Sequence, residues 1–210
     1  MVLSVIMKHR ANDILLAEKV IKFAEPLGGV FSLSDLYQLL QETSVSGKKK
    51  KLAKLIKTKM ILRWQRGIYT TQNFDPWLLA QRLNPKGYIS LDSVLSKKGL
   101  TGTISNQSVS IVIPARNRVV AKHSFVFSFY QTSLSLLFGF SRNEKGVAVA
   151  DNEKAYLDLL YYYMRGYRFN IDPFIDVNVS KLDKKKYFSY LKKYKNPKFV
   201  KFAERMVYGS

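Results

Sequence analysis

The feature that most constrains the fold is a lysine-rich helical stretch that runs almost directly into a β-hairpin. Residues 46–57 hold six lysines among leucine, isoleucine and alanine, and the period of the apolar residues predicts a helix. Two short apolar runs follow, Ile61–Trp64 and Ile68–Thr70. The turn Gln65-Arg66-Gly67 between them has glycine where a tight hairpin needs it.

Two further helices are expected before this stretch. Asn12 and Asp13 are expected to cap a first amphipathic helix that ends before Gly28, and Ser34 is expected to cap a second whose leucines form one face. Three helices followed by a hairpin are typical of a winged helix-turn-helix, which we expect over residues 1–75. The alternative is a small helical domain with a solvated lysine face. We favour the winged helix because the hairpin follows the third helix almost at once, and because the excess of basic over acidic residues is concentrated in the third helix and the hairpin.

Charge is concentrated in two parts of the chain. The net charge is +20, from 35 Lys and Arg against 15 Asp and Glu. Residues 43–74 contain nine basic and no acidic side chains, and residues 181–210 contain ten basic and two acidic ones. Such a chain attracts polyanions, because neutralising phosphates releases counterions. An anionic membrane surface and an acidic protein partner are the competing explanations.

The third helix has the two faces that a DNA-reading helix needs. At about 100° per residue, Leu52, Leu55 and Ile56 share one face, and Lys50, Lys54 and Lys57 lie opposite. Ser46 is expected to cap the helix and, with Lys50, to contact base edges, while the other lysines contact phosphates. The expected DNA-binding residues are Ser46, Lys49, Lys50, Lys51, Lys54 and Lys57 on the helix, with Gln65 and Arg66 at the hairpin tip.

Residues 76–210 are expected to form a second domain of mixed α/β type, so that the whole chain is α+β. Asn73–Pro76 is the expected boundary, and a connecting helix over Trp77–Leu83 and a helix capped by Ser90 are expected next. Asp151 is expected to cap another helix. The expected strands are Ser108–Ile113, Phe125–Tyr130 and Val147–Ala150; the later helices are Asn152–Met164 and a pair, Leu182–Tyr194 and Lys198–Val207.

The basic C-terminal part, residues 181–210, has three possible explanations. It interleaves lysines with aromatic residues, a combination that binds nucleic acid by charge and stacking. It also suits docking to an acidic protein, or a helical pair whose lysines are simply solvated. The candidate contact residues are Lys184, Lys185, Lys192, Lys193 and Lys195.

No catalytic, cofactor or metal site is expected. The chain has no cysteine, and its two histidines, His9 and His123, are far apart. Glu153 and Asp158 are five residues apart on one expected helix, about 140° round it, so their carboxylates do not converge. No apolar run reaches the roughly 20 residues that span a bilayer. We therefore expect a soluble, cytoplasmic protein that is not an enzyme and has no membrane partner.

Four segments of the chain resemble parts of one known family. Gly87–Leu95, ending in Gly99-Leu100-Thr101, resembles the start of that family's C-terminal effector domain. Val109–Pro114 with Arg116-Asn117-Arg118 resembles its central strand and basic turn. Val149–Tyr161 resembles its most recognisable stretch, and Arg66–Tyr69 is similar to its wing. The family is the AbiE-type antitoxins of type IV toxin–antitoxin systems, which are linked to abortive phage infection.

The resemblance implies a bacterial protein that represses its own operon by binding inverted repeats in promoter DNA. It also implies that the protein counteracts a nucleotidyltransferase-like toxin, without necessarily forming a stable complex with it. The lysine-only front of the third helix departs from the family, so DNA sequence specificity does not carry over. A stand-alone regulator whose second domain senses a ligand or partner is the alternative. For a third class, an enzyme such as a nuclease, no residues converge.

Overall fold

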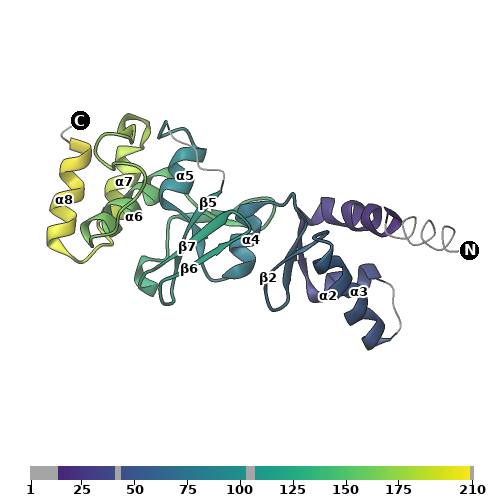
Figure 1. Cartoon of the computed structure of the whole chain (residues 1–210). Helices are drawn as coiled ribbons and strands as arrows, with labels where there is room; N and C mark the ends of the chain where they lie inside the picture. Colours follow the sequence, from purple (N-terminus) through teal and green to yellow (C-terminus); the bar gives the residue numbers. More distant parts are fainter. Residues whose placement is uncertain (1–13, 41–43, 103–106, 209–210) are drawn as a thin grey trace, which may run out of the picture. The chain divides into compact units, whose positions relative to one another are not determined.

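The computed structural model describes residues 14–40, 44–102 and 107–208 of an α+β protein (Figure 1). The chain divides into two compact units, Met1–Leu83 (unit 1) and Asn84–Ser210 (unit 2). The division therefore falls after Leu83 instead of at residue 75. Helix α4 (Pro76–Leu83) stays with unit 1, because Asp75 caps it and the Asp75 amide donates to the Gly28 carbonyl at 2.9 Å.

Unit 1 consists of helices and one small three-stranded sheet, whose strands lie between the helices along the chain (Figure 1). Strand β3 lies in the middle, antiparallel to both β1 and β2. Asn12 and Asp13, the expected caps of the first helix, lie outside the described residues. In chain order the elements are a helix over residues 14–24, a 3-10 turn (Glu25–Leu27), β1 (Val30–Ser32), α2 (Leu33–Leu40), α3 (Val45–Lys57), β2 (Leu62–Gln65), β3 (Ile68–Thr70) and α4.

The predictions that Ser34 caps α2 and that Ser46 caps α3 are both wrong. Ser32 caps α2: its Oγ accepts from the Asp35 amide at 3.1 Å, and the Asp35 carboxylate accepts from the Ser32 amide at 2.7 Å. Ser34 lies inside that helix. Ser44, in an extended conformation, caps α3 by accepting from the Gly47 amide at 2.9 Å, so Ser46 lies in the first turn. In both cases the helix starts earlier than predicted, at the residue where the extended chain ends.

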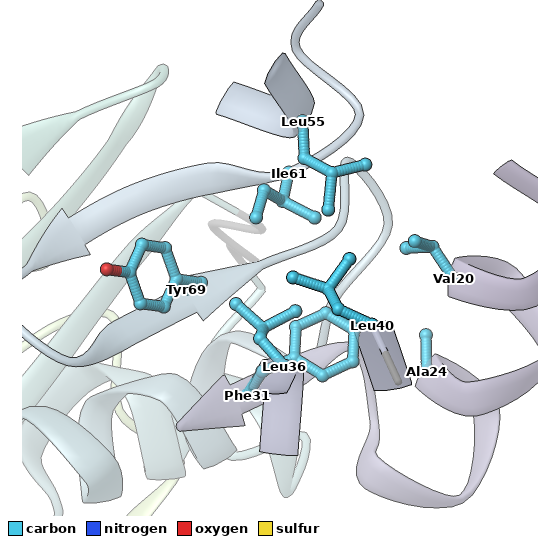
Figure 2. Close-up of a cluster of buried hydrophobic side chains, with 8 residues drawn as sticks. All are labelled: Val20, Ala24, Phe31, Leu36, Leu40, Leu55, Ile61 and Tyr69. Carbon is cyan, nitrogen blue, oxygen red and sulfur yellow. The ribbon is translucent and has the colours of Figure 1, made fainter. Parts of the chain in front are cut away.

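The core of unit 1 joins the first helix, β1, α2, α3 and β3, together with Ile61 just before β2. Figure 2 shows side chains from the first helix, β1, α2, α3 and the hairpin meeting in one cluster. Leu55 is the buried residue of α3, and its burial contributes about 1.5–3 kcal/mol. The buried members are Val20, Ala24, Phe31, Leu36, Leu40, Leu55, Ile61 and Tyr69.

Unit 2 is built on a mixed six-stranded sheet in the order β6-β7-β5-β4-β9-β8, in which β5–β7 and β4–β9 are parallel. Helix α6 has the predicted bounds and the predicted cap, Asp151, which accepts from the Lys154 amide at 2.9 Å. The edge strands β6 and β8 and the short inner strand β4 were not predicted. Within the described residues, no helix is long and apolar enough to cross a membrane. The elements are β4 (Tyr88–Ile89), α5 (Leu91–Lys97), β5 (Ser108–Ile113), β6 (Arg118–Lys122), β7 (Phe125–Gln131), a 3-10 turn (Leu134–Leu136), β8 (Phe140–Arg142), β9 (Ala148–Ala150), α6 (Asn152–Met164), a 3-10 turn (Val179–Lys181), α7 (Lys184–Leu191) and α8 (Pro197–Tyr208).

A fully buried ion pair ties three parts of unit 2 together. The Nζ of Lys154 lies 2.5 Å from the Asp158 carboxylate and donates to the Tyr194 hydroxyl at 3.0 Å. Asp158 also accepts from the Tyr88 hydroxyl at 2.9 Å and from the Ser90 hydroxyl at 2.8 Å. Ser90 therefore does not cap α5 with its side chain. Burial, together with the charge of Asp158, raises the pKa of both tyrosines, so they stay protonated.

This pair predicts a non-additive stability effect. We expect Lys154→Met to lower the free energy of unfolding by about 3–5 kcal/mol, because it leaves a buried carboxylate without its cation. Adding Asp158→Asn should restore part of that loss, since the amide is neutral and still accepts from Tyr88. Urea unfolding measures both. Lys186→Gln, which breaks a half-exposed pair, is the control and should cost less than about 1 kcal/mol. Equal losses from all three variants would contradict this role.

Candidate nucleic-acid interface

Helix α3 presents its lysines on the side opposite the core, as the helical wheel predicts. Leu55 points into the cluster of Figure 2, and Leu52 and Ile56 are half-buried against it. Lys50, Lys54 and Lys57 on the other side are exposed, as are Lys49 and Lys51 at the flanks. Lys48 differs, because it is half-buried with its Nζ 5.5 Å from the centre of the Tyr37 ring on α2. Lys48 therefore links α3 to α2, a contact that the wheel does not reveal.

The first two turns of α3 begin with the exposed Val45 and then combine small side chains with positive charge. Ser44 satisfies one of the free amides of the helix, and Ser46 and Gly47 follow without bulk. Ser46 is exposed in the first turn, one helical turn before Lys49 and Lys50. The amino end of a helix carries a partial positive charge, so lysines there add to a potential that attracts anions.

The segment that contains α3 supplies positive charge only. Residues 44–74 contain no aspartate or glutamate. Lysines three or four residues apart, such as Lys50 and Lys54, repel each other by a few tenths of a kcal/mol per pair. The helix is stabilised instead by its cap and by the burial of Leu55. A bound polyanion would relieve this repulsion.

The β2–β3 hairpin holds a second polar tip rigidly. Trp64 is buried, and its indole N–H donates to the Thr70 hydroxyl at 2.9 Å. Gly67 has φ +82° in open space, so glycine is needed for the backbone conformation alone. Gln65 and Arg66 are exposed beside it, at the tip where the sequence predicted them.

Two cations near these residues were not among the predicted contacts. Lys59 follows α3 with φ +56°, and its carbonyl accepts from the Gln72 side chain at 2.8 Å. Arg63 lies on β2, where exposed and buried residues alternate, and its side chain is exposed. Strand alternation could have predicted Arg63, because its neighbours Leu62 and Trp64 are apolar. Lys59 had no comparable signal.

The predicted C-terminal contacts lie in the other unit. Lys184, Lys185, Lys192, Lys193 and Lys195 are all exposed on α7 or just after it. The aromatic residues between them turn inward: Tyr187 donates to the Ala203 carbonyl at 3.0 Å, and the Tyr194 and Phe199 rings lie 4.7 Å apart. The helical pair therefore shows its lysines outside, whereas Tyr187, Tyr194 and Phe199 are buried and Phe188, Tyr190 and Phe202 are half-buried, which weakens the stacking part of the nucleic-acid explanation.

The carboxylates of α6 are used for structure. Glu153 accepts from the Asp183 amide at 3.0 Å and lies 3.4 Å from the Lys186 Nζ. Asp158 belongs to the buried ion pair with Lys154. The two do not converge, as predicted. Across the part of the chain that the structure describes, no three His, Asp or Glu residues are grouped as metal ligands would be.

The fold has a counterpart among solved structures. It is similar to the crystal structure of the RV2827C protein from Mycobacterium tuberculosis, with a TM-score of 0.61 over 92% of this chain and 76% of that one. Sequence identity is 13%, so the likeness concerns the fold alone. No protein-family model matches the chain, and no curated protein matches its sequence.

The reassigned cap predicts different roles for two neighbouring serines. Ser44→Ala should lower the free energy of unfolding by about 1 kcal/mol, because it removes the cap of α3. Ser46→Ala, exposed within the first turn, should change stability by less than about 0.5 kcal/mol. Thermal or urea unfolding of the two variants makes the comparison. The reverse order of effects would show that Ser46 is the cap after all.

Proposed function

We propose that unit 1 is a winged helix-turn-helix that binds double-stranded DNA. The observation that carries the proposal is the exposed face of α3, where Lys50, Lys54 and Lys57 stand opposite the buried Leu55 in a segment without acidic residues. The order helix, strand, helix, helix, strand, strand supports it, because the winged helix has this order. The major groove of DNA is about 12 Å wide and admits a helix such as α3.

In this proposal α3 enters the major groove and the hairpin contacts the neighbouring backbone. Ser46 and Lys50, near the amino end of α3, face base edges; Lys54 and Lys57 neutralise phosphates. Arg66 at the hairpin tip reaches a phosphate or the minor groove. Because lysine is a point charge and discriminates bases less well than arginine, binding should be strong, salt-sensitive and only modestly selective from α3 alone.

We further propose that the protein is a bacterial antitoxin that represses its own operon in the cytoplasm. Support comes from the resemblance of residues in both units to AbiE-type antitoxins, above all Val149–Tyr161. Within that stretch, Asp151 caps α6, and Lys154 and Asp158 form the buried ion pair. These residues stabilise unit 2, so the residues that counteract the toxin must be sought elsewhere on its surface.

The DNA proposal predicts opposite effects on binding and stability. Lys50→Ala with Lys54→Ala should remove the preference for promoter DNA over unrelated DNA. It should also raise the free energy of unfolding by about 0.5 kcal/mol, because it relieves repulsion within α3. Fluorescence anisotropy and urea unfolding measure the two effects. Lys192→Gln with Lys193→Gln is the matched control and should leave the affinity ratio unchanged. If both pairs reduced the ratio equally, α3 would not be the reading helix.

The antitoxin proposal predicts that the two activities separate. The Lys50→Ala, Lys54→Ala chain, expressed from a foreign promoter, should still rescue growth from a nucleotidyltransferase-like toxin encoded beside this gene, because the effector domain is intact. A promoter–reporter fusion should lose repression in the same cells. If the unmodified chain represses the reporter but fails to rescue growth, the protein is a stand-alone regulator instead.

A further inference from the structure

The outer sides of α7 and α8 form a second concentration of positive charge, distinct from α3. We define the α7–α8 basic surface by its exposed cations, which are Lys184, Lys185, Lys192, Lys193, Lys195, Lys198, Lys201 and Arg205. On α8, Lys198, Lys201 and Arg205 recur at intervals of three and four residues, which places them in one stripe. Phe199 and Ala203 are buried on the opposite side. Lys185 on α7 and Lys192 directly after it lie opposite the buried Tyr187 and Leu191 in the same way.

The carboxylates near α7 are engaged within the structure, and α8 carries one, the half-buried Glu204, against three exposed cations. Asp183 caps α7 by accepting from the Lys186 amide at 3.0 Å. Asp151 and Glu153 are paired with Lys186, at 2.8 Å and 3.4 Å. Burial lowers the pKa of Lys186, but the hydrogen bond with Asp151 and the negative charges of Asp151 and Glu153 outweigh this effect. The pKa of Lys186 is therefore raised. Three cations of this segment thus serve the structure: Lys186 in these pairs, Lys181 by donating to the Gly99 carbonyl at 2.8 Å, and Lys193 with its Nζ 4.2 Å from the centre of the Phe138 ring. The other lysines of the basic surface are exposed to an external anion.

The composition of the surface indicates the kind of anion. Protein–protein interfaces favour arginine and aromatic anchors and are poor in lysine. Here residues 181–210 hold nine lysines and one arginine, and among their described members none is an exposed large hydrophobic. Single-stranded nucleic acid needs exposed rings for stacking. Here Tyr187, Tyr194 and Phe199 are buried, and Phe188, Tyr190 and Phe202 are half-buried. A lysine surface without fully exposed anchors or rings suits the regular phosphates of a duplex.

We infer that the α7–α8 basic surface is a second, sequence-independent binding surface for double-stranded DNA. The duplex part of the inference stands on unit 2 alone. The choice of DNA over RNA rests on the function proposed for unit 1, because a chain that holds one duplex presents its other basic surface to DNA at high local concentration. Each phosphate that the protein neutralises adds about 0.9 to the steepness of the salt dependence of binding. Such contacts strengthen binding on any sequence and leave selectivity to α3.

The test uses the full chain carrying Lys50→Ala and Lys54→Ala, so that α3 contributes little. Its affinity for a mixed-sequence DNA duplex without the promoter site is measured by fluorescence anisotropy over a range of KCl concentrations. Two triple variants are compared, Lys198→Gln, Lys201→Gln, Arg205→Gln and Lys185→Gln, Lys192→Gln, Lys195→Gln. The control, Lys86→Gln, Lys97→Gln, Lys98→Gln, removes the same charge from exposed positions elsewhere in unit 2. Circular dichroism checks that all variants fold.

We expect each α7–α8 triple variant to flatten the plot of log affinity against log salt by about 0.9 for every phosphate that it no longer neutralises, and the control to leave the slope unchanged. Equal flattening by the control would mean that net charge alone acts, and would overturn the inference. An RNA duplex of the same length and a polyglutamate peptide are measured in parallel. Tighter, surface-dependent binding of either would assign the surface to RNA or to an acidic protein instead. The outcome does not depend on promoter selectivity, so it is distinguishable from failure of the α3 proposal.

Discussion

Unit 1 depends on one balance in α3, between the mutual repulsion of its lysines and the burial of Leu55 in the core. Six lysines lie on thirteen residues without a carboxylate, and the helix is held by the Ser44 cap and by Leu55 in the core. Repulsion within α3 costs a few tenths of a kcal/mol per lysine pair, whereas burial of one leucine contributes several times more. The helix therefore forms, with a front that carries positive charge only. This front gives the helix its proposed function, since a phosphate backbone supplies the complementary negative charge.

Unit 2 differs from unit 1 because the charges that stabilise it are buried. Lys154 and Asp158 are buried together and linked to Tyr88, Ser90 and Tyr194. The network connects β4, α6 and the chain after α7, so it fixes the position of the helical pair that carries the outer lysines. Charges inside unit 2 thus determine its shape, and charges outside determine what it attracts.

Local signals in the sequence were enough to predict most elements, and they failed where tertiary contacts decide. The bounds of α6 follow from Asp151, and the exposed face of α3 follows from helical periodicity. The capping serines of α2 and α3 could not be chosen from the sequence, because each helix has two candidate serines two residues apart. The pairing of β1 decides between Ser32 and Ser34, and the burial of Leu55 decides between Ser44 and Ser46. The four-residue spacing of Lys154 and Asp158 is compatible with an ion pair, but Tyr194 is 40 residues from Lys154. The inward packing of the aromatics after residue 181 likewise depends on how α7 and α8 meet.

Lysine footprinting tests the central claim most directly. The protein is acetylated briefly with and without promoter duplex, and the modification of each lysine is measured by mass spectrometry. DNA should protect Lys50, Lys54 and Lys57, while Lys97 and Lys98 should react equally in both samples. If the three α3 lysines react as fast in the complex as in the free protein, α3 does not contact DNA and the proposed winged helix-turn-helix function is wrong.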